Sequence, residues 1–154
     1  MSVKETARRQ YIRLADTAAR QLSGLSAPKE GWIATIRKAL SMSGAQLARR
    51  AGVTKAAIYQ AERNEREGAI TLNQMEKTAQ ALGCRFVYAI VPDNEIKTII
   101  RQHARQKAEA LVRRASAHMA LEKQSLPAHE TRAEIERQAE EMARNMPSDF
   151  WEDR

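Results

Sequence analysis

The stretch from Ser43 to Gly83 constrains the fold more than any other part of this chain. Gly52 supplies a left-handed turn residue between a helix over 44–50 and a second helix that runs to about Asn64. A polar loop and a third helix over 72–82 follow, and Gly83 ends that helix. A short polar side chain precedes each helix as a candidate N-cap: Ser43, Thr54 and Thr71. Two helices around a tight turn, backed by a third, can place one helix in a DNA major groove.

The flanking sequence predicts further helices. Apolar residues recur at three- and four-residue steps over 4–22, 32–41, 93–123 and 131–145, and TRAE at 131–134 matches a capping box. Only six glycines and four prolines interrupt the chain, which also favours helix. We therefore expect a mainly α protein in four parts: an N-terminal helix and linker (1–30), a helix-turn-helix DNA-binding domain (31–83), a dimerisation strand (84–92) and a C-terminal helical extension (93–154).

Residues 84–92 differ in character from the helices around them. The run CRFVYAIV is β-branched and aromatic, and Pro92 closes it, so the sequence predicts a strand. No other strand candidate is visible, and unpaired backbone groups are costly when buried. Pairing with the same strand of a second copy is favoured over a hairpin within the chain. We thus expect a homodimer whose interface includes Arg85, Phe86, Val87, Tyr88, Ala89 and Ile90.

The charge is uneven along the chain. There are 26 Lys and Arg against 19 Asp and Glu, a net charge of +7. Residues 31–92 hold nine basic and four acidic residues, whereas residues 124–154 hold four basic and eight acidic residues. A basic body suggests a polyanion as partner, with an ordinary solvated surface as the alternative. No apolar run spans a membrane and the N-terminus lacks a secretory signal, so a cytoplasmic protein is expected.

The segment 43–83 resembles the phage-repressor-like (Xre/Cro) helix-turn-helix family. The matching residues are small, turn and apolar residues at fixed offsets: Leu47, Ala48, Gly52, Val53, Ile58, Glu62, Leu72 and the run 79–83. Many members of that family carry Gln at the start of the first motif helix, where this chain has Gly44. This departure puts the docking angle on DNA in question.

The resemblance implies which side chains reach DNA. Helical phase turns Ala57, Ile58 and Ala61 inward, so the expected contacts with bases or phosphates are Thr54, Lys55, Ala56, Tyr59, Gln60 and Arg63. Gln60 can pair with adenine, Lys55 can reach guanine or a phosphate, and Tyr59 can contact a thymine methyl or a phosphate. Arg49, Arg50, Arg63 and Arg66 are expected to bind phosphates. The alternatives are a solvated Gln60, a partly buried Tyr59 and arginines that are ordinary surface.

Nearly the whole chain resembles the mobile mystery protein A family, through GWIATIRKAL, AQLARRAGV, ITLNQMEKTAQALGCRFVYAIVP and the terminal tryptophan. That family is encoded beside mobile mystery protein B, which contains a Fic domain. The resemblance implies a transcription regulator, with autorepression of a mobile or toxin–antitoxin-like operon through a palindromic operator. The alternative is an antitoxin that contacts the Fic-domain partner directly.

A direct contact with such a partner has two candidate sites, the acidic helix 131–145 and the aromatic pair Phe150–Trp151. The alternative for the aromatic pair is a tail folded back on its own core.

An enzyme is not expected. His103, His118 and His129 are widely spaced, and His103 lies on an apolar stripe as a packed residue. Cys84 has no evident base, and the chain has no phosphate-binding glycine loop. No metal or other cofactor is therefore predicted.

Overall fold

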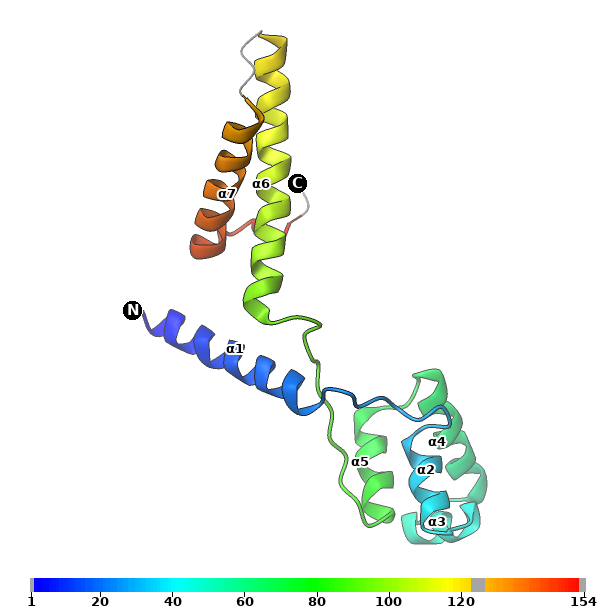
Figure 1. Cartoon of the computed structure of the whole chain (residues 1–154). Coiled ribbons are helices and arrows are strands. Elements are labelled where there is room, and N and C mark those ends of the chain that lie inside the picture. The colour runs from blue at the N-terminus through cyan, green and yellow to red at the C-terminus, as the bar shows by residue number, and fades with distance from the viewer. Residues whose placement is uncertain (1, 123–126, 153–154) are drawn as a thin grey trace. The chain divides into compact units, whose positions relative to one another are not determined.

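The computed structural model describes residues 2–122 and 127–152. Within these residues it contains seven helices and no strand (Figure 1). The chain divides into a central unit, Leu22–Ala89, and a terminal unit, Met1–Gln21 with Ile90–Arg154. The predicted mainly α fold is confirmed. None of the described helices combines the length and apolar character needed to cross a membrane.

The central unit holds four short helices around one core. They are α2 (Trp32–Ala39), α3 (Gly44–Ala51), α4 (Lys55–Glu67) and α5 (Leu72–Ala81). The core side chains are Ile33, Leu47, Ala48, Ile58, Ala61, Met75 and Leu82. Ile58 and Ala61 point inward as predicted, whereas Ala57, also expected to do so, is only partly buried. Because α3 and α4 share this core across the turn, their crossing geometry is fixed by apolar packing.

The three N-caps predicted in the central unit are confirmed. The Ser43 hydroxyl oxygen accepts a hydrogen bond from the Gln46 backbone N–H at 3.1 Å. The Gln46 side-chain oxygen accepts one from the Ser43 backbone N–H, which completes a capping box. The hydroxyls of Thr54 and Thr71 cap α4 and α5 in the same way. Gly52 has φ of 69° and ends α3, as expected for the turn. Helix ends differ from the prediction: α2 stops at Ala39, two residues before the predicted end, and α4 continues three residues beyond Asn64.

In the terminal unit, α6 (Ile96–Leu121) and α7 (Ala128–Asn145) lie side by side as a helical hairpin (Figure 1). The chain then turns back at Met146, and Phe150 enters the core against Ile100 and Ala104 with 1% of its surface exposed. The His103 Nε2–H donates to the Phe150 carbonyl at 2.5 Å, and the His103 ring stacks on Trp151. The prediction of a packed His103 is confirmed.

Two sequence interpretations need correction here. Phe150 is buried in its own chain and is not an exposed anchor for a partner, so the folded-back tail is the arrangement that occurs. The capping box at 131–134 is also wrong, because α7 begins three residues earlier and the Thr131 hydroxyl donates to the Pro127 carbonyl. Glu134 instead binds Arg137 at 2.6 Å. Pro127 precedes the helix as its N-cap residue.

The N-terminal helix α1 (Val3–Gln21) forms as predicted, but its apolar face is not covered. It has no buried residue, and Tyr11 is 72% exposed. Its bond to the rest of the terminal unit is polar: the Asp16 carboxylate accepts from the Ile96 N–H, at the start of α6, at 3.0 Å. That bond satisfies one of the free N–H groups at a helix N-terminus.

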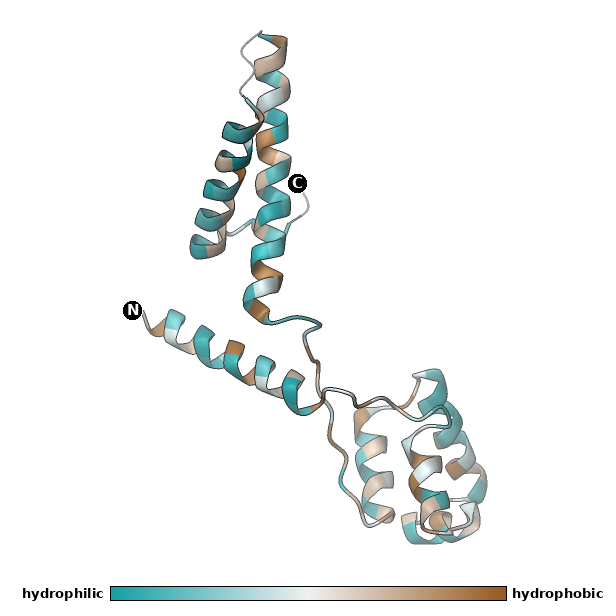
Figure 2. Ribbon diagram, in the orientation of Figure 1, coloured by the Kyte–Doolittle hydropathy of each residue, from teal (hydrophilic) through white to brown (hydrophobic). Residues whose placement is uncertain are grey.

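The predicted strand over 84–92 does not form within a single chain. Cys84 closes α5 through a hydrogen bond to the Ala79 carbonyl at 2.8 Å, and residues 85–91 make no backbone–backbone bond with any described residue. The physical reason is that a ladder needs a second strand, and no other described segment supplies one. Figure 2 shows hydrophobic residues along this exposed segment, which runs on from α5.

Candidate nucleic-acid interface

The polar side of α4 is open within its unit. Ile58 and Ala61 are buried in the core, and the predicted reading residues lie exposed on the opposite side: Thr54, Lys55, Ala56, Tyr59, Gln60 and Arg63. The first turn of α4 contains no acidic residue, so its free N–H groups and Lys55 together present positive potential. The start of this helix can therefore receive a phosphate or a base edge.

A buried ion pair holds α4 in place. Arg37 of α2 donates two hydrogen bonds to the Glu62 carboxylate of α4. Its Nε donates to Oε1 at 2.6 Å, and its Nη2 donates to Oε2 at 3.3 Å. The Arg37 Nη1 also donates to the Met42 carbonyl at 3.1 Å. The side chains are only 11% and 6% exposed. The hydrogen bond to Glu62 raises the pKa of Arg37, against the lowering effect of burial.

A second carboxylate on α4 caps α2. The oxygens of Glu65 accept from the backbone N–H groups of Trp32 at 2.5 Å and Ile33 at 2.9 Å. A carboxylate at a helix N-terminus accepts hydrogen bonds from free N–H groups, and its negative charge is stabilised by the positive end of the helix dipole. The sequence analysis predicted neither this cap nor the partner of Glu62. The signal was the position of Glu62 and Glu65 on the core-facing side of α4, where a carboxylate needs a hydrogen-bond or ion-pair partner.

Tyr59 explains the unusual Gly44. A Cβ atom added at Gly44 would lie 2.7 Å from the Tyr59 Cζ and hydroxyl oxygen, so the ring occupies the space over the start of α3. The Arg37 guanidinium carbon and the Lys55 Nζ each lie 5.8 Å from the ring centroid, within the range of cation–π attraction. Tyr59 is thus partly packed and partly exposed, and it links the buried ion pair to the reading surface.

The remaining predicted contacts are not equivalent. Gln60 is exposed and its amide donates to the Asn64 side chain at 2.8 Å, a surface bond that it can exchange for a base. Arg50 donates to the Ala81 carbonyl at 2.7 Å and so closes the end of α5. Arg66 lies about 16 Å along α4 from Lys55, which places it at the other end of the helix. Arg49 is exposed in the last turn of α3.

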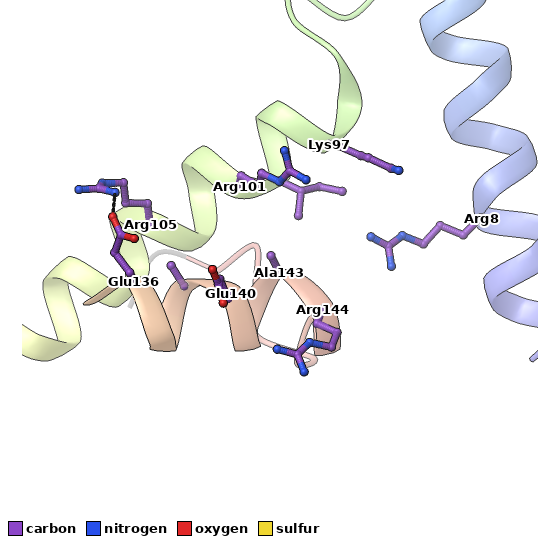
Figure 3. A pocket seen from close by; sticks show the side chains of 10 residues that line it. Arg8, Lys97, Arg101, Arg105, Glu136, Glu140, Ala143 and Arg144 are labelled. Carbon is purple, nitrogen blue, oxygen red and sulfur yellow. Dashed lines mark hydrogen bonds and ion pairs between the residues drawn. The ribbon is translucent and has the colours of Figure 1, made fainter. Parts of the chain in front are cut away.

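A separate concave site lies in the terminal unit and was not predicted. Its cavity of about 670 Å³ has a cationic rim that includes Arg8, Lys97 and Arg101. Figure 3 shows Arg8 and Lys97 directed toward the same space, and Arg105 bound to Glu136 at 3.3 Å. Glu136 and Glu140 belong to the same rim, so the site is of mixed charge and does not by itself indicate a ligand.

Comparison with known proteins identifies the central unit. Residues 33–88 match the family model HTH_3, described as helix-turn-helix. No curated protein and no solved structure gives a significant match to the chain. The matched residues include α2 to α5, the core around Leu47 and Ile58, and the first part of the segment after α5. Residues 33–88 are therefore a helix-turn-helix domain of the Xre and lambda-repressor type, a fold of DNA-binding regulators.

Proposed function

We propose that this protein is a sequence-specific DNA-binding transcription regulator that reads bases with α4. The observation that carries the proposal is the two-sided character of α4 within a helix-turn-helix domain. One side is held by apolar packing and by the Arg37–Glu62 pair, while the other offers Lys55 and Gln60 without cover from its own unit. A rigid support with an exposed polar edge suits readout in the major groove.

The proposed roles follow from position. Gln60 binds an adenine edge, and Lys55 binds guanine or a neighbouring phosphate. Thr54 offers its hydroxyl hydrogen to a phosphate while its oxygen caps α4. Arg49, exposed in the last turn of α3, and Arg63, exposed on α4, are proposed to bind phosphates. Arg50 and Arg66 have a smaller part, since one closes α5 and the other lies far along the helix.

The experiment first selects DNA fragments retained by the full-length protein, then measures affinity by fluorescence anisotropy. Gln60→Ala is expected to lose about 1–3 kcal/mol of preference for the selected site over its single-base variants. Arg49→Ala should weaken all sequences alike and flatten the slope of log K against log salt by about 0.9. Arg132→Ala on α7 is the matched control. Affinity that does not depend on salt or on Gln60 refutes the proposal.

We extend this proposal to autorepression. The resemblance to mobile mystery protein A suggests an operon shared with a Fic-domain protein, and a dimer would bind two half-sites of a palindromic operator about 34 Å apart. Footprinting on the promoter of the protein's own gene tests this, and protection of two half-sites in the same phase is expected. Protection confined to other promoters would oppose autorepression.

Direct contact with a Fic-domain partner is a different function with its own test. Phe150 is buried, so the exposed residues available for that contact are Trp151 and the carboxylates of α7. Deletion of the tail would uncover the core around Ile100 and would not be a clean test. Trp151→Ala in a co-purification with the neighbouring protein is the sharper experiment, with Leu121→Ala as control. Loss of the complex in Trp151→Ala alone would favour the antitoxin function.

A further inference from the structure

The segment Cys84–Ala89, which closes the central unit, exposes apolar side chains and free backbone groups. Val87 is 69% and Tyr88 71% exposed, and residues 85–89 make no backbone–backbone bond with any described residue. We propose that this segment pairs antiparallel with the same segment of a second copy, and that the apolar groove beside it receives side chains of that copy. The inference deepens the dimer in the proposed function, but it does not depend on DNA binding.

The segment already has the alternation of a strand. The rings of Phe86 and Tyr88, two residues apart, stack with centroids 5.9 Å apart and planes 21° from parallel. Residues i and i+2 share one side only when the backbone is extended. Phe86 packs against the core of the central unit, which orients the segment, and Val87 remains largely exposed. An extended, apolar segment with free N–H and C=O groups is a template for pairing with another strand.

The groove lies directly beside this segment. It has a volume of about 390 Å³ between α2, α5 and residues 84–87. Its lining is apolar apart from Arg85, and it includes Leu25, Trp32, Ile36 and Met75. Trp32 is 39% exposed at this surface. Contiguous apolar surface of this kind on a small protein usually marks an interaction site.

A second copy fits this surface better than an unrelated partner does. A two-fold axis through an antiparallel pair places the groove of each copy beside the segment of the other, so one apolar patch supplies both halves of the interface. The single charged side chain in the lining is Arg85, so the patch offers little charge pattern for a strongly acidic or basic partner. No residue of α3 or α4 lines the groove, and the reading residues stay free when it is filled.

Sedimentation equilibrium of the full-length protein tests the interface. The wild-type chain is expected to be a dimer, and Val87→Glu to raise the dimer Kd about a hundredfold or more, because each dimer loses two buried valines and gains like charges across the pair. Leu121→Glu, a substitution at a largely exposed residue on α6, is the control and should leave Kd unchanged. Circular dichroism checks folding, which Val87→Glu should preserve because Val87 is exposed.

A distance measurement locates the interface independently. Cys84 is the single cysteine of the chain and is exposed, so a nitroxide label reports on this position alone. Antiparallel pairing that sets residue 84 of one copy opposite residue 89 of the other puts the two Cys84 α carbons about 18 Å apart. A wild-type monomer, a dimer unaffected by Val87→Glu, or labels much farther apart than this would each overturn the inference. A dimer that binds no DNA would contradict the proposed function and leave this interface intact.

Discussion

Replacement of Glu62 by Gln should destabilise the central unit more than any surface change. The substitution keeps the shape of the side chain but leaves the Arg37 guanidinium, only 11% exposed, without its charged partner. Removing one member of a buried ion pair costs about 3–5 kcal/mol, because the remaining charge is still desolvated. The glutamine oxygen can still accept one hydrogen bond from Arg37, so we expect a loss near the lower end, about 3 kcal/mol.

Urea unfolding followed by tryptophan fluorescence measures this loss. The chain has two tryptophans, and Trp151→Phe leaves Trp32, at the start of α2, as the reporter of the central unit. Glu62→Gln in that background should lower the unfolding midpoint by roughly 1–3 M urea, from an m-value of about 1–3 kcal/mol/M. Glu67→Gln, an exposed change on the same helix, should stay within about 0.5 kcal/mol of the parent.

Two outcomes would refute the reasoning. A decrease of less than about 1 kcal/mol in the free energy of unfolding of Glu62→Gln would mean that solvent screens the Arg37–Glu62 pair as it does a surface ion pair. The double variant Arg37→Met with Glu62→Leu offers a second check, since apolar residues of similar volume often replace a buried pair at little cost. It should be more stable than Glu62→Gln alone. A double variant that is less stable would show that the loss is not caused by an uncompensated charge.

Three further outcomes are expected. Gly44→Ala should change the free energy of unfolding by less than about 1 kcal/mol, because a gain in helix propensity offsets weakened cation–π contacts of Tyr59. It should still weaken operator binding, because the added methyl group displaces the Tyr59 ring. An affinity equal to that of the wild type in fluorescence anisotropy would contradict this. Phe150→Ala should cost the terminal unit about 3–5 kcal/mol in thermal unfolding, and a smaller loss would mean that the tail packs loosely. The bond from Arg137 lowers the pKa of Glu134 from 4.5 to about 2, so its contribution to stability is present above the ordinary pKa and lost as pH falls toward 2. NMR titration should show this midpoint rising toward the ordinary value in Arg137→Gln, and an unchanged midpoint would exclude Arg137 as the cause.

The local features of the fold were predictable because their causes lie within a few residues. Ser43 and Thr54 bond to N–H groups three residues ahead, and a glycine such as Gly52 is needed wherever the backbone turns left-handed. The exposed side of α4 follows from helical period alone. The sequence could therefore indicate which side of α4 is exposed, although it could not show that Arg50 donates to the Ala81 carbonyl.

The long-range features were not predictable by the same means. The partner of Glu62 lies 25 residues away on α2, and no periodic pattern connects the two positions. Phe150 illustrates the same limit, since an aromatic near a chain end reads equally as an exposed anchor or a core residue until a hairpin such as α6–α7 is seen to receive it. The strand over 84–92 fails for a different reason: its propensity is real, but the hydrogen bonds that define a strand need a second segment.

We expect Arg37 to couple the stability of the domain to the DNA contact proposed for α4. The same guanidinium binds the buried Glu62 carboxylate and lies 5.8 Å from the centroid of the Tyr59 ring, as does the Lys55 ammonium. A change at Glu62 that frees Arg37 to rotate would remove one of the two cations that hold the ring. Lys55 would then lose a fixed neighbour, and the space over Gly44 would open. In the folded fraction of Glu62→Gln we therefore expect operator preference to fall along with stability, because support and readout share one side chain.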